Sequence, residues 1–270
     1  MTSMVRQAVV AGRFYPRDRD ALLTDLRSYL SPAETALPAL GCVAPHAGYI
    51  YSGAVAGAVF ANIDIAQHCI VLGPNHTGKG RPLAIMSNGA WETPLGSVPI
   101  DSALANALKQ EFSLLTEDSD AHHSEHAIEV ELPFLQTRRP DLTFVPIALG
   151  TGQFEILKKL GEAVADVVQK QDEDILIIAS SDMNHYESDI ITREKDRRAI
   201  DRLLALDARG LFDVVKKEDI SMCGFGPAVV MLTATKRLGA TKSELVRYAT
   251  SGDVSGDRET VVGYAGVVVW

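Results

Sequence analysis

Cysteine is scarce in this 270-residue chain, which contains only Cys42, Cys69 and Cys223. Because the cysteines are odd in number and widely spaced, they do not indicate a disulfide framework. We therefore expect reduced thiols and a cytoplasmic protein. Positive charge is also in short supply: the net charge of −9 argues against a nucleic-acid partner or an acidic membrane surface. No apolar run reaches the roughly 18 residues needed to span a bilayer, and the N-terminus lacks a secretory signal pattern.

Internal repeats and low-complexity tracts are absent from the sequence as well. The only linker-like stretch, residues 31–38, is too short to separate two domains. Hydrophobic residues make up 46% of the chain, which is enough to form a sizeable core. We therefore expect a single domain that spans residues 1–270.

Segments with apolar residues at helical spacing alternate with short apolar runs typical of buried strands. We predict helices at residues 18–30, 55–61, 101–111, 153–170, 192–204 and 226–238. Strands are predicted at residues 40–44, 69–72, 83–86, 142–148, 174–179, 245–249 and 261–269. Such alternation predicts an α/β fold, a three-layer sandwich with a mainly parallel or mixed central sheet that contains the apolar last strand.

Three of these predicted strands end in a short turn that carries a histidine. The turns place His46 after the first strand, His76 after the second and His185 after the strand at residues 174–179. Ligands of open α/β sheets bind beyond the carboxyl ends of the strands, so three imidazoles there predict a metal or catalytic site. Imidazole is the commonest metal ligand, although any one of these histidines could simply hydrogen-bond its own loop.

The turn at residues 180–185 adds a carboxylate beside the third histidine. Asp182 either caps the segment that follows it or contributes to the site. His185 is suited to general acid–base chemistry, because an unperturbed pKa of about 6.5 lets imidazole carry protons near neutral pH.

Residues 121–134 hold the densest histidine cluster of the chain. We expect a helix to begin at Glu125, with His126 on its first turn and directed to the same site. His122 and His123 are assigned to a solvated loop. No glutamate follows the first histidine, so the zinc-protease pattern HExxH is not met.

Cys223 lies just before the helix predicted at residues 226–238. A helix N-terminus favours a thiolate, and the flanking Gly224 and Gly226 would leave room for a ligand to approach the sulfur. Cys42 and Cys69 lie inside predicted strands and are assigned to packing.

A set of aromatic residues near the motifs indicates either a pocket for a planar ligand or ordinary packing: Tyr15, Tyr49, Tyr51, Tyr186 and Phe225.

Several uncommon motifs, in a fixed order, resemble the Memo family, which is called protein B of the AmmeMemoRadiSam system in prokaryotes. They are residues 11–16 (AGRFYP), 45–49 (PHAGY), 51–53 (YSG), 73–76 (GPNH), 125–129 (EHAIE), 181–186 (SDMNHY) and 223–224 (CG). The family is similar in fold to the class III extradiol dioxygenases, which hold iron through two histidines and a carboxylate. The resemblance implies metal ligation by His46, His76 and Cys223, with His126, Asp182 and His185 in catalytic positions around them.

A cysteine in place of the carboxylate changes the expected chemistry, because a soft thiolate favours copper, zinc or iron. We expect iron or copper in a metal-dependent oxidoreductase that acts on a small, aromatic or peptide ligand. Three alternatives stay open: a metal-free module that binds a peptide or anionic ligand, a Cys223 nucleophile paired with a histidine, and a zinc hydrolase. The sequence decides neither the substrate nor the oligomeric state.

Overall fold

The centre of the molecule is a mixed β-sheet, seen in a computed structural model that describes residues 4–31 and 36–270. Its strand order is β10-β12-β2-β9-β3-β8-β4-β7, and β11 pairs with β12 as well. These strands are β2 (Gly41–Ala44), β3 (His68–Pro74), β4 (Leu83–Ile85), β7 (Thr116–Glu117), β8 (Thr143–Leu149), β9 (Ile175–Ser180), β10 (His185–Glu187), β11 (Ser243–Thr250) and β12 (Val261–Val269). A second, three-stranded sheet contains β1 (Val5–Arg6), β5 (Ala90–Thr93) and β6 (Gly96–Pro99).

The four middle strands, β2, β9, β3 and β8, run parallel to one another, whereas β12 and β4 join them antiparallel. Their side chains alternate between two separate apolar cores. In β9, Ile177 packs into one core while Leu176 and Ile178 pack into the other. A strand that is buried on both faces shows a continuous apolar run in the sequence, which is why these strands were predictable.

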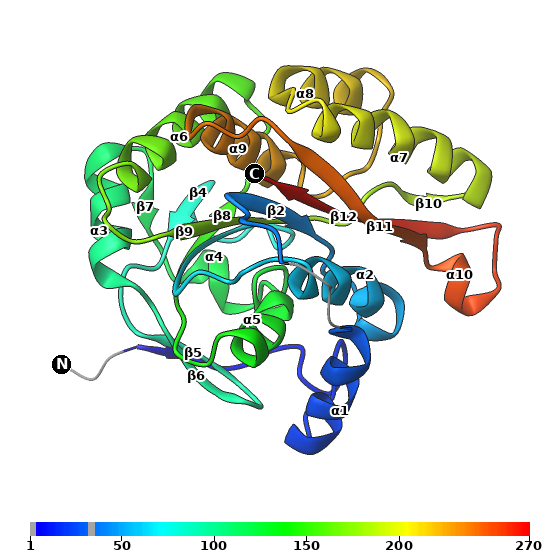
Figure 1. Cartoon of the computed structure of the whole chain (residues 1–270), viewed down its shortest axis with the longest axis horizontal. Helices are drawn as coiled ribbons and strands as arrows, with labels where there is room; N and C mark the ends of the chain where they lie inside the picture. The colour runs from blue at the N-terminus through cyan, green and yellow to red at the C-terminus, as the bar shows by residue number, and fades with distance from the viewer. Residues whose placement is uncertain (1–3, 32–35) are drawn as a thin grey trace.

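Helices cover both faces of this sheet, as Figure 1 shows. The helices are α1 (Arg19–Tyr29), α2 (Tyr49–Ala61), α3 (Ser102–Glu111), α4 (Asp120–His123), α5 (Leu132–Arg138), α6 (Phe154–Val168), α7 (Asp189–Leu204), α8 (Ala208–Lys217), α9 (Phe225–Arg237) and α10 (Gly252–Ser255), with the 3₁₀ turn η1 (Glu129–Glu131). α6, α8 and α9 lie on one side of the sheet, and α1, α2 and α5 on the other. The predicted three-layer α/β class is confirmed.

Two helix predictions differ most from the structure. α2 starts at Tyr49 and not at residue 55. Its first two turns are apolar on nearly every side, so they lack the periodicity that reveals an amphipathic helix. The helix expected from Glu125 is wrong: α4 ends at His123, and a turn through His126 precedes η1 and α5.

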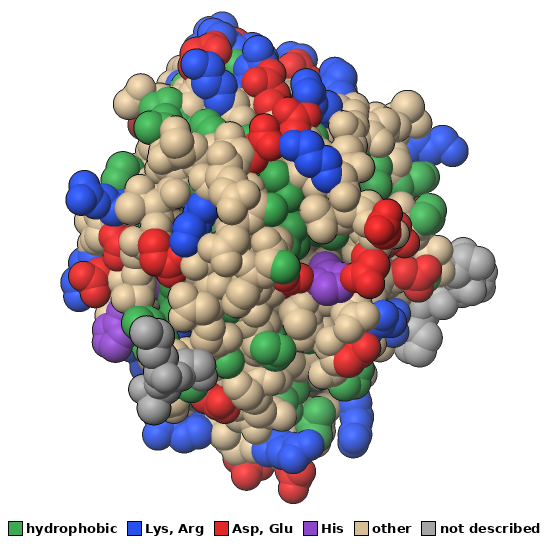
Figure 2. Space-filling view, turned by 90° about the vertical axis from the view of Figure 1, so that its left-hand side faces the viewer, with side chains coloured by type: hydrophobic (Ala, Val, Ile, Leu, Met, Phe, Trp, Pro, Cys, Tyr) green, Lys and Arg blue, Asp and Glu red, His purple; other side chains and the backbone are tan. Residues whose placement is uncertain are grey.

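Among the described residues, no helix is both long and apolar enough to cross a membrane. The face of the molecule in Figure 2 carries acidic and basic side chains that are interspersed with one another, with apolar side chains scattered between them. The residues at positions 32–35 of the linker-like stretch lie outside the described part of the chain.

Candidate metal centre

The carboxyl ends of β2, β9 and β3 deliver the predicted histidine-bearing turns to one edge of the sheet. β9 pairs with β2 on one side and with β3 on the other, so it lies between the strands that lead to His46 and His76. The strands that lead to His46 and His76 are therefore not adjacent in the sheet. The position of β9 between these strands places its last residue, Ser180, in contact with the His46 ring.

Three side chains offer donor atoms that converge at this edge. One atom each from His46, His76 and Cys223 lie within 4.8 Å of one another. His46 Nε2 is 3.3 Å from Cys223 Sγ. His46 is buried and His76 is exposed, so the cluster is closed on one side and reaches solvent on the other.

The His46 ring is held at its other nitrogen. His46 Nδ1 lies 2.8 Å from the hydroxyl of Ser180, which leaves Nε2 to face the sulfur. Burial, and then the nearby His126, His76 and His185 rings, hold the pKa of His46 well below its ordinary value. A neutral imidazole with a free Nε2 is the form that binds a metal.

The His76 ring is held by a carboxylate. Glu125 Oε1 lies 2.9 Å from His76 Nδ1, and Glu125 Oε2 accepts the His76 backbone N–H at 2.6 Å. Although burial opposes ionisation, the hydrogen bond from His76 and the nearby imidazoles lower the pKa of Glu125 to about 2. A carboxylate bound to the distal nitrogen of a histidine orients the ring and raises its basicity as a metal ligand.

Glu125 could itself be a ligand, since one atom each from His76, Glu125 and His126 also lie within 4.8 Å of one another. However, its two oxygens already accept bonds from His76 Nδ1 and from the backbone N–H groups of His76, His126 and Ala127. We therefore assign Glu125 to the support of His76 and not to the ligand set.

The N-terminal segment fixes the turn that carries Glu125 and His126. The Arg6 guanidinium donates to the backbone oxygens of His122 and Glu125 and forms a buried ion pair with Glu129 at 2.7 Å. The Tyr15 hydroxyl donates to the same Glu129 carboxylate at 2.7 Å. Through Tyr15, the motif at residues 11–16 thus helps to hold the turn that carries Glu125 and His126. The sequence alone does not reveal this contact.

His126 and His185 lie beside the three converging side chains. The His126 ring stacks on His76 with centroids 4.8 Å apart and meets the His46 ring edge-on at 5.4 Å. His185 Nδ1 is 2.9 Å from the backbone oxygen of Ser221, so its Nε2 is the nitrogen left for proton transfer. Burial is the main cause that lowers the pKa of both His126 and His185.

Asp182 supports the loop of His46. Its Oδ1 accepts the backbone N–H of His46 at 2.9 Å and that of Ala47 at 3.3 Å, so it caps a different loop from the one expected. Burial raises the pKa of Asp182 to about 7.

The surroundings of Cys223 differ from two expectations. Burial, and then the Asp182 carboxyl, raise the pKa of the Cys223 thiol, so the start of α9 does not by itself produce a thiolate. The space beside Gly224 is also filled: a Cβ there would lie 2.3 Å from the Ser180 backbone oxygen. Gly224 is required because the chain before α9 packs directly against the end of β9.

The loop assignment of His122 and His123 is wrong. Both lie in α4, where His122 is fully buried and His123 is exposed.

Among the aromatic candidates, Tyr15 and Tyr49 are buried packing residues, as the alternative interpretation held. Tyr51 and Tyr186 are 38% and 76% exposed, and Phe225 is partly buried. Phe225 lies beside Phe212 and Lys216.

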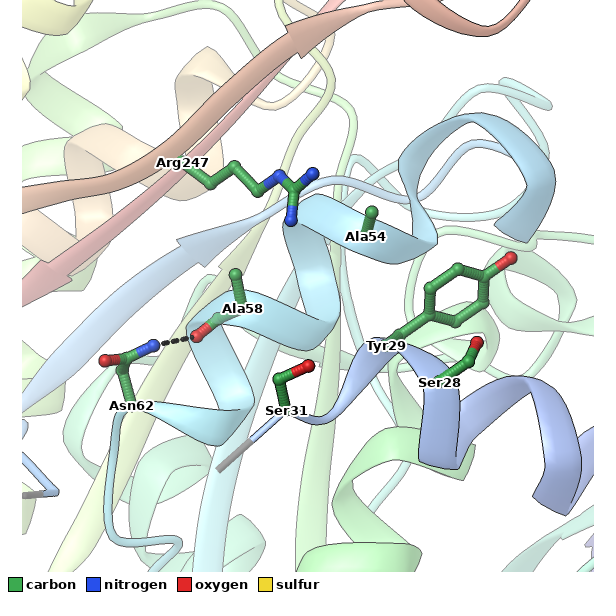
Figure 3. Close-up of a pocket in the computed structure, with 7 residues that line it drawn as sticks. All are labelled: Ser28, Tyr29, Ser31, Ala54, Ala58, Asn62 and Arg247. Atoms are coloured by element: carbon green, nitrogen blue, oxygen red, sulfur yellow. Dashed lines mark hydrogen bonds between the residues drawn. The ribbon is translucent and has the colours of Figure 1, made fainter. Parts of the chain in front are cut away.

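The surface cavity in Figure 3 is unrelated to this centre. Its volume is about 290 Å³, and it is lined by Ser28, Tyr29, Ser31, Ala54, Ala58, Asn62 and Arg247. Asn62 donates to the Ala58 backbone oxygen at 2.7 Å, and Arg247 points in from the edge strand β11. None of the converging histidines lines it.

A family model described as Memo-like protein matches residues 6–268 of the chain. The chain belongs to the Memo-like family. A MEMO1 family protein of Methanopyrus kandleri is 43% identical, over 98% of this chain and 99% of that protein. A MEMO1 family protein of Methanosarcina barkeri is also 43% identical, over 98% of this chain and 100% of that protein.

A solved structure of an uncharacterized protein from Escherichia coli K12 is similar in fold to this Memo-like chain. It aligns with a TM-score of 0.56 and 12% identity, covering 84% of this chain and 98% of that one. That likeness concerns the fold alone. The resemblance to the Memo family that the motifs indicated is confirmed.

The donor set of this Memo-like chain fits a metal ion on geometric grounds. Nitrogen and sulfur ligands at about 2.05 and 2.3 Å from a tetrahedral metal lie about 3.6 Å apart. The His46 Nε2 to Cys223 Sγ distance of 3.3 Å is close to that value. Both histidines also have a partner at Nδ1, as metal-binding histidines almost always do.

Replacing Glu125 with Gln should weaken metal binding by about 10–100-fold, because His76 loses the charged partner that orients its ring. A competition titration with a chromogenic chelator measures this. The matched control is Glu173→Gln, which removes a carboxylate 2.5 Å from another histidine, His68, at the opposite end of β3. An equal loss of affinity in both variants would contradict the support role of Glu125.

Proposed function

We propose that this Memo-like protein is a metal-dependent oxidoreductase whose iron or copper ion is held by His46, His76 and Cys223. The observation that carries the proposal is the convergence of one atom from each residue within 4.8 Å. The three residues come from separate segments of the chain: two follow the ends of β2 and β3, and Cys223 lies just before α9. A bound iron or copper ion would supply electron transfer to or from a small, aromatic or peptide substrate.

The chain's own residues would position the substrate and move protons. His185 Nδ1 is engaged by the Ser221 carbonyl, so Nε2 is the ring nitrogen that would accept or donate a proton. His126 shares that task from the other side of the cluster, next to His76. Asp182 orients the His46 loop through two backbone N–H groups.

A cysteine nucleophile is less well supported. Such a mechanism needs a thiolate, whereas burial and Asp182 raise the pKa of Cys223. The partner histidine would have to take the proton, yet burial also keeps the pKa of His46 low. A metal ion resolves this conflict, because a coordinating thiol is deprotonated by the metal's own charge.

The test is anaerobic metal analysis of freshly purified protein, with His46→Ala and Cys223→Ser beside the wild type. We expect near-stoichiometric iron or copper in the wild type and its loss in both variants. His123→Ala is the matched control, because His123 is an exposed histidine outside the cluster. Alkylation of Cys223 should be slower when metal is bound.

Other outcomes discriminate between the alternatives. Zinc in the same pattern would favour a hydrolase that uses the same ligands. Protein that contains no metal and cannot be reconstituted would sink the proposal and leave a binding module for a peptide or anionic ligand.

A further inference from the structure

The hydroxyl of Ser180 has three partners and only one hydrogen to share among them. Its Oγ is 2.8 Å from His46 Nδ1, 2.8 Å from the Ala127 backbone oxygen and 2.8 Å from Glu131 Oε1. Ser180 and Glu131 are both fully buried, so no solvent hydrogen bond can replace a missing one. Three close contacts around one oxygen require three hydrogens.

The source of each hydrogen follows from the chemistry of the partners. A serine hydroxyl donates once and accepts twice, and a carbonyl oxygen can only accept. The single Ser180 hydrogen therefore goes to Ala127, and the other two partners must bring their own. An ionised Glu131, or a His46 without hydrogen on Nδ1, would leave two lone pairs facing each other at 2.8 Å.

We propose that Glu131 is a protonated carboxylic acid that donates to Ser180, and that Ser180, whose own hydrogen goes to Ala127, fixes His46 in the tautomer with hydrogen on Nδ1. Glu131 touches neither a ligand nor the reacting atoms, so it is a positioning residue. The effect of the Ser180 contact on metal affinity rests on the function proposed above, whereas the protonation state of Glu131 does not.

The surroundings of Glu131 favour the neutral acid. Burial, and then the nearby Asp182 carboxyl, raise the pKa of Glu131 well above its ordinary value, although a hydrogen bond donated by Ser180 to the ionised form would lower it. The other ionisable groups that feel its charge are Cys42 on β2 and Tyr49 on α2, and neither is a cation. Glu131 Oε2 has no hydrogen-bond partner among the described residues, which an ionised oxygen could not tolerate in a buried position.

The sequence places this group where no motif would show it. Glu131 follows the EHAIE motif by two residues and ends the 3₁₀ turn η1, and its partner Ser180 is the last residue of β9. Two histidines of one centre are thus held by different chemistry: His76 by an ionised carboxylate and His46 by a neutral hydroxyl backed by an acid. We expect His76 to be the more basic ligand of the two.

Infrared spectroscopy of the metal-free protein at pH 8.5 tests the protonation state. We expect the carbonyl stretch of a protonated carboxyl group in the wild type and its absence in Glu131→Gln. The pH is chosen because burial raises the pKa of Asp182 and Asp196 only to about 7, so both are largely ionised at pH 8.5. No such band in the wild type, or a band that persists in Glu131→Gln, would overturn the proposal.

Nitrogen-15 NMR of the imidazoles tests the tautomer, with the His46 signals identified by their loss in His46→Gln. We expect hydrogen on Nδ1 in the wild type and in Glu131→Gln, whose amide can still donate to Ser180. Ser180→Ala removes the acceptor of the His46 Nδ1 hydrogen and should give mixed tautomers and a 10–100-fold weaker affinity for Zn²⁺. A wild-type His46 with hydrogen on Nε2 would overturn the proposal even if metal analysis succeeds.

Discussion

Zn²⁺ at 100–1,000 times its dissociation constant is expected to raise the free energy of unfolding of the metal-free protein by about 3–4 kcal/mol. The stabilisation arises because His46, His76 and Cys223 are brought within 4.8 Å only in the folded chain. Zn²⁺ is the reporter of choice since it binds nitrogen and sulfur ligands without redox chemistry. Each kcal/mol should shift the midpoint of thermal unfolding by roughly 2–4 °C.

Cys223→Ser and His76→Ala should lose most of this stabilisation, because each removes a donor atom. His123→Ala should keep it in full, since His123 is exposed and lies in α4 outside the cluster. Chemical denaturation monitored by circular dichroism gives the free energy of unfolding of each variant with and without Zn²⁺. Equal stabilisation of the wild type and Cys223→Ser would mean that Zn²⁺ binds elsewhere.

The elements that position this centre were predictable from local sequence. β2, β3 and β9 are buried on both faces, so each shows as an unbroken apolar run followed by turn residues. Parallel pairing then brings their carboxyl ends together, and with them His46, His76 and His185. The prediction worked because one physical rule, burial on two faces, shapes the sequence of all three strands.

Other elements carry no such signature. α2 is apolar around most of its circumference, and its first turns were missed for lack of periodicity. α8 was missed although Leu211 and Val215 are buried one turn apart and Asp207 caps its N-terminus through Gly210. That helix was recognisable in principle, because an acidic cap before apolar residues at helical spacing marks a helix start.

The supporting residues of the centre could not be found from sequence. Glu125 reaches His76 across 49 residues of chain, and Ser180 reaches His46 across 134. Single glutamates and serines are common, and their spacing in the sequence carries no trace of such contacts. Only the packed fold shows that Glu125 contacts the His76 ring directly, whereas Glu131 reaches His46 only through Ser180.

His122 should make the protein sensitive to acid. It is fully buried in α4, and neither ring nitrogen has a hydrogen-bond partner among the described residues. Burial, and then the Arg6 guanidinium, lower the pKa of His122 to about 4. In the unfolded chain the same imidazole should titrate near its ordinary value of about 6.5.

The direction of the effect follows from proton binding. Above pH 6.5 neither state holds the proton, so His122 costs no stability there. Between about pH 6.5 and pH 4 the unfolded chain binds the proton and the folded chain does not, so stability falls as the pH falls. The difference of about 2.5 pKa units corresponds to a loss of about 3 kcal/mol across that window, with no further loss from this group below pH 4.

His122→Phe isolates this contribution, because phenylalanine has a similar shape, cannot bind a proton and can pack against the Trp91 ring, which lies 5.7 Å from the His122 ring. We expect the variant to lose about 3 kcal/mol less than the wild type between pH 6.5 and pH 4 in urea denaturation. His123→Gln removes the adjacent but exposed histidine and should leave the wild-type slope unchanged. If His122→Phe keeps the full acid slope, the proton binds another buried group, and the burial of His122 does not control acid stability.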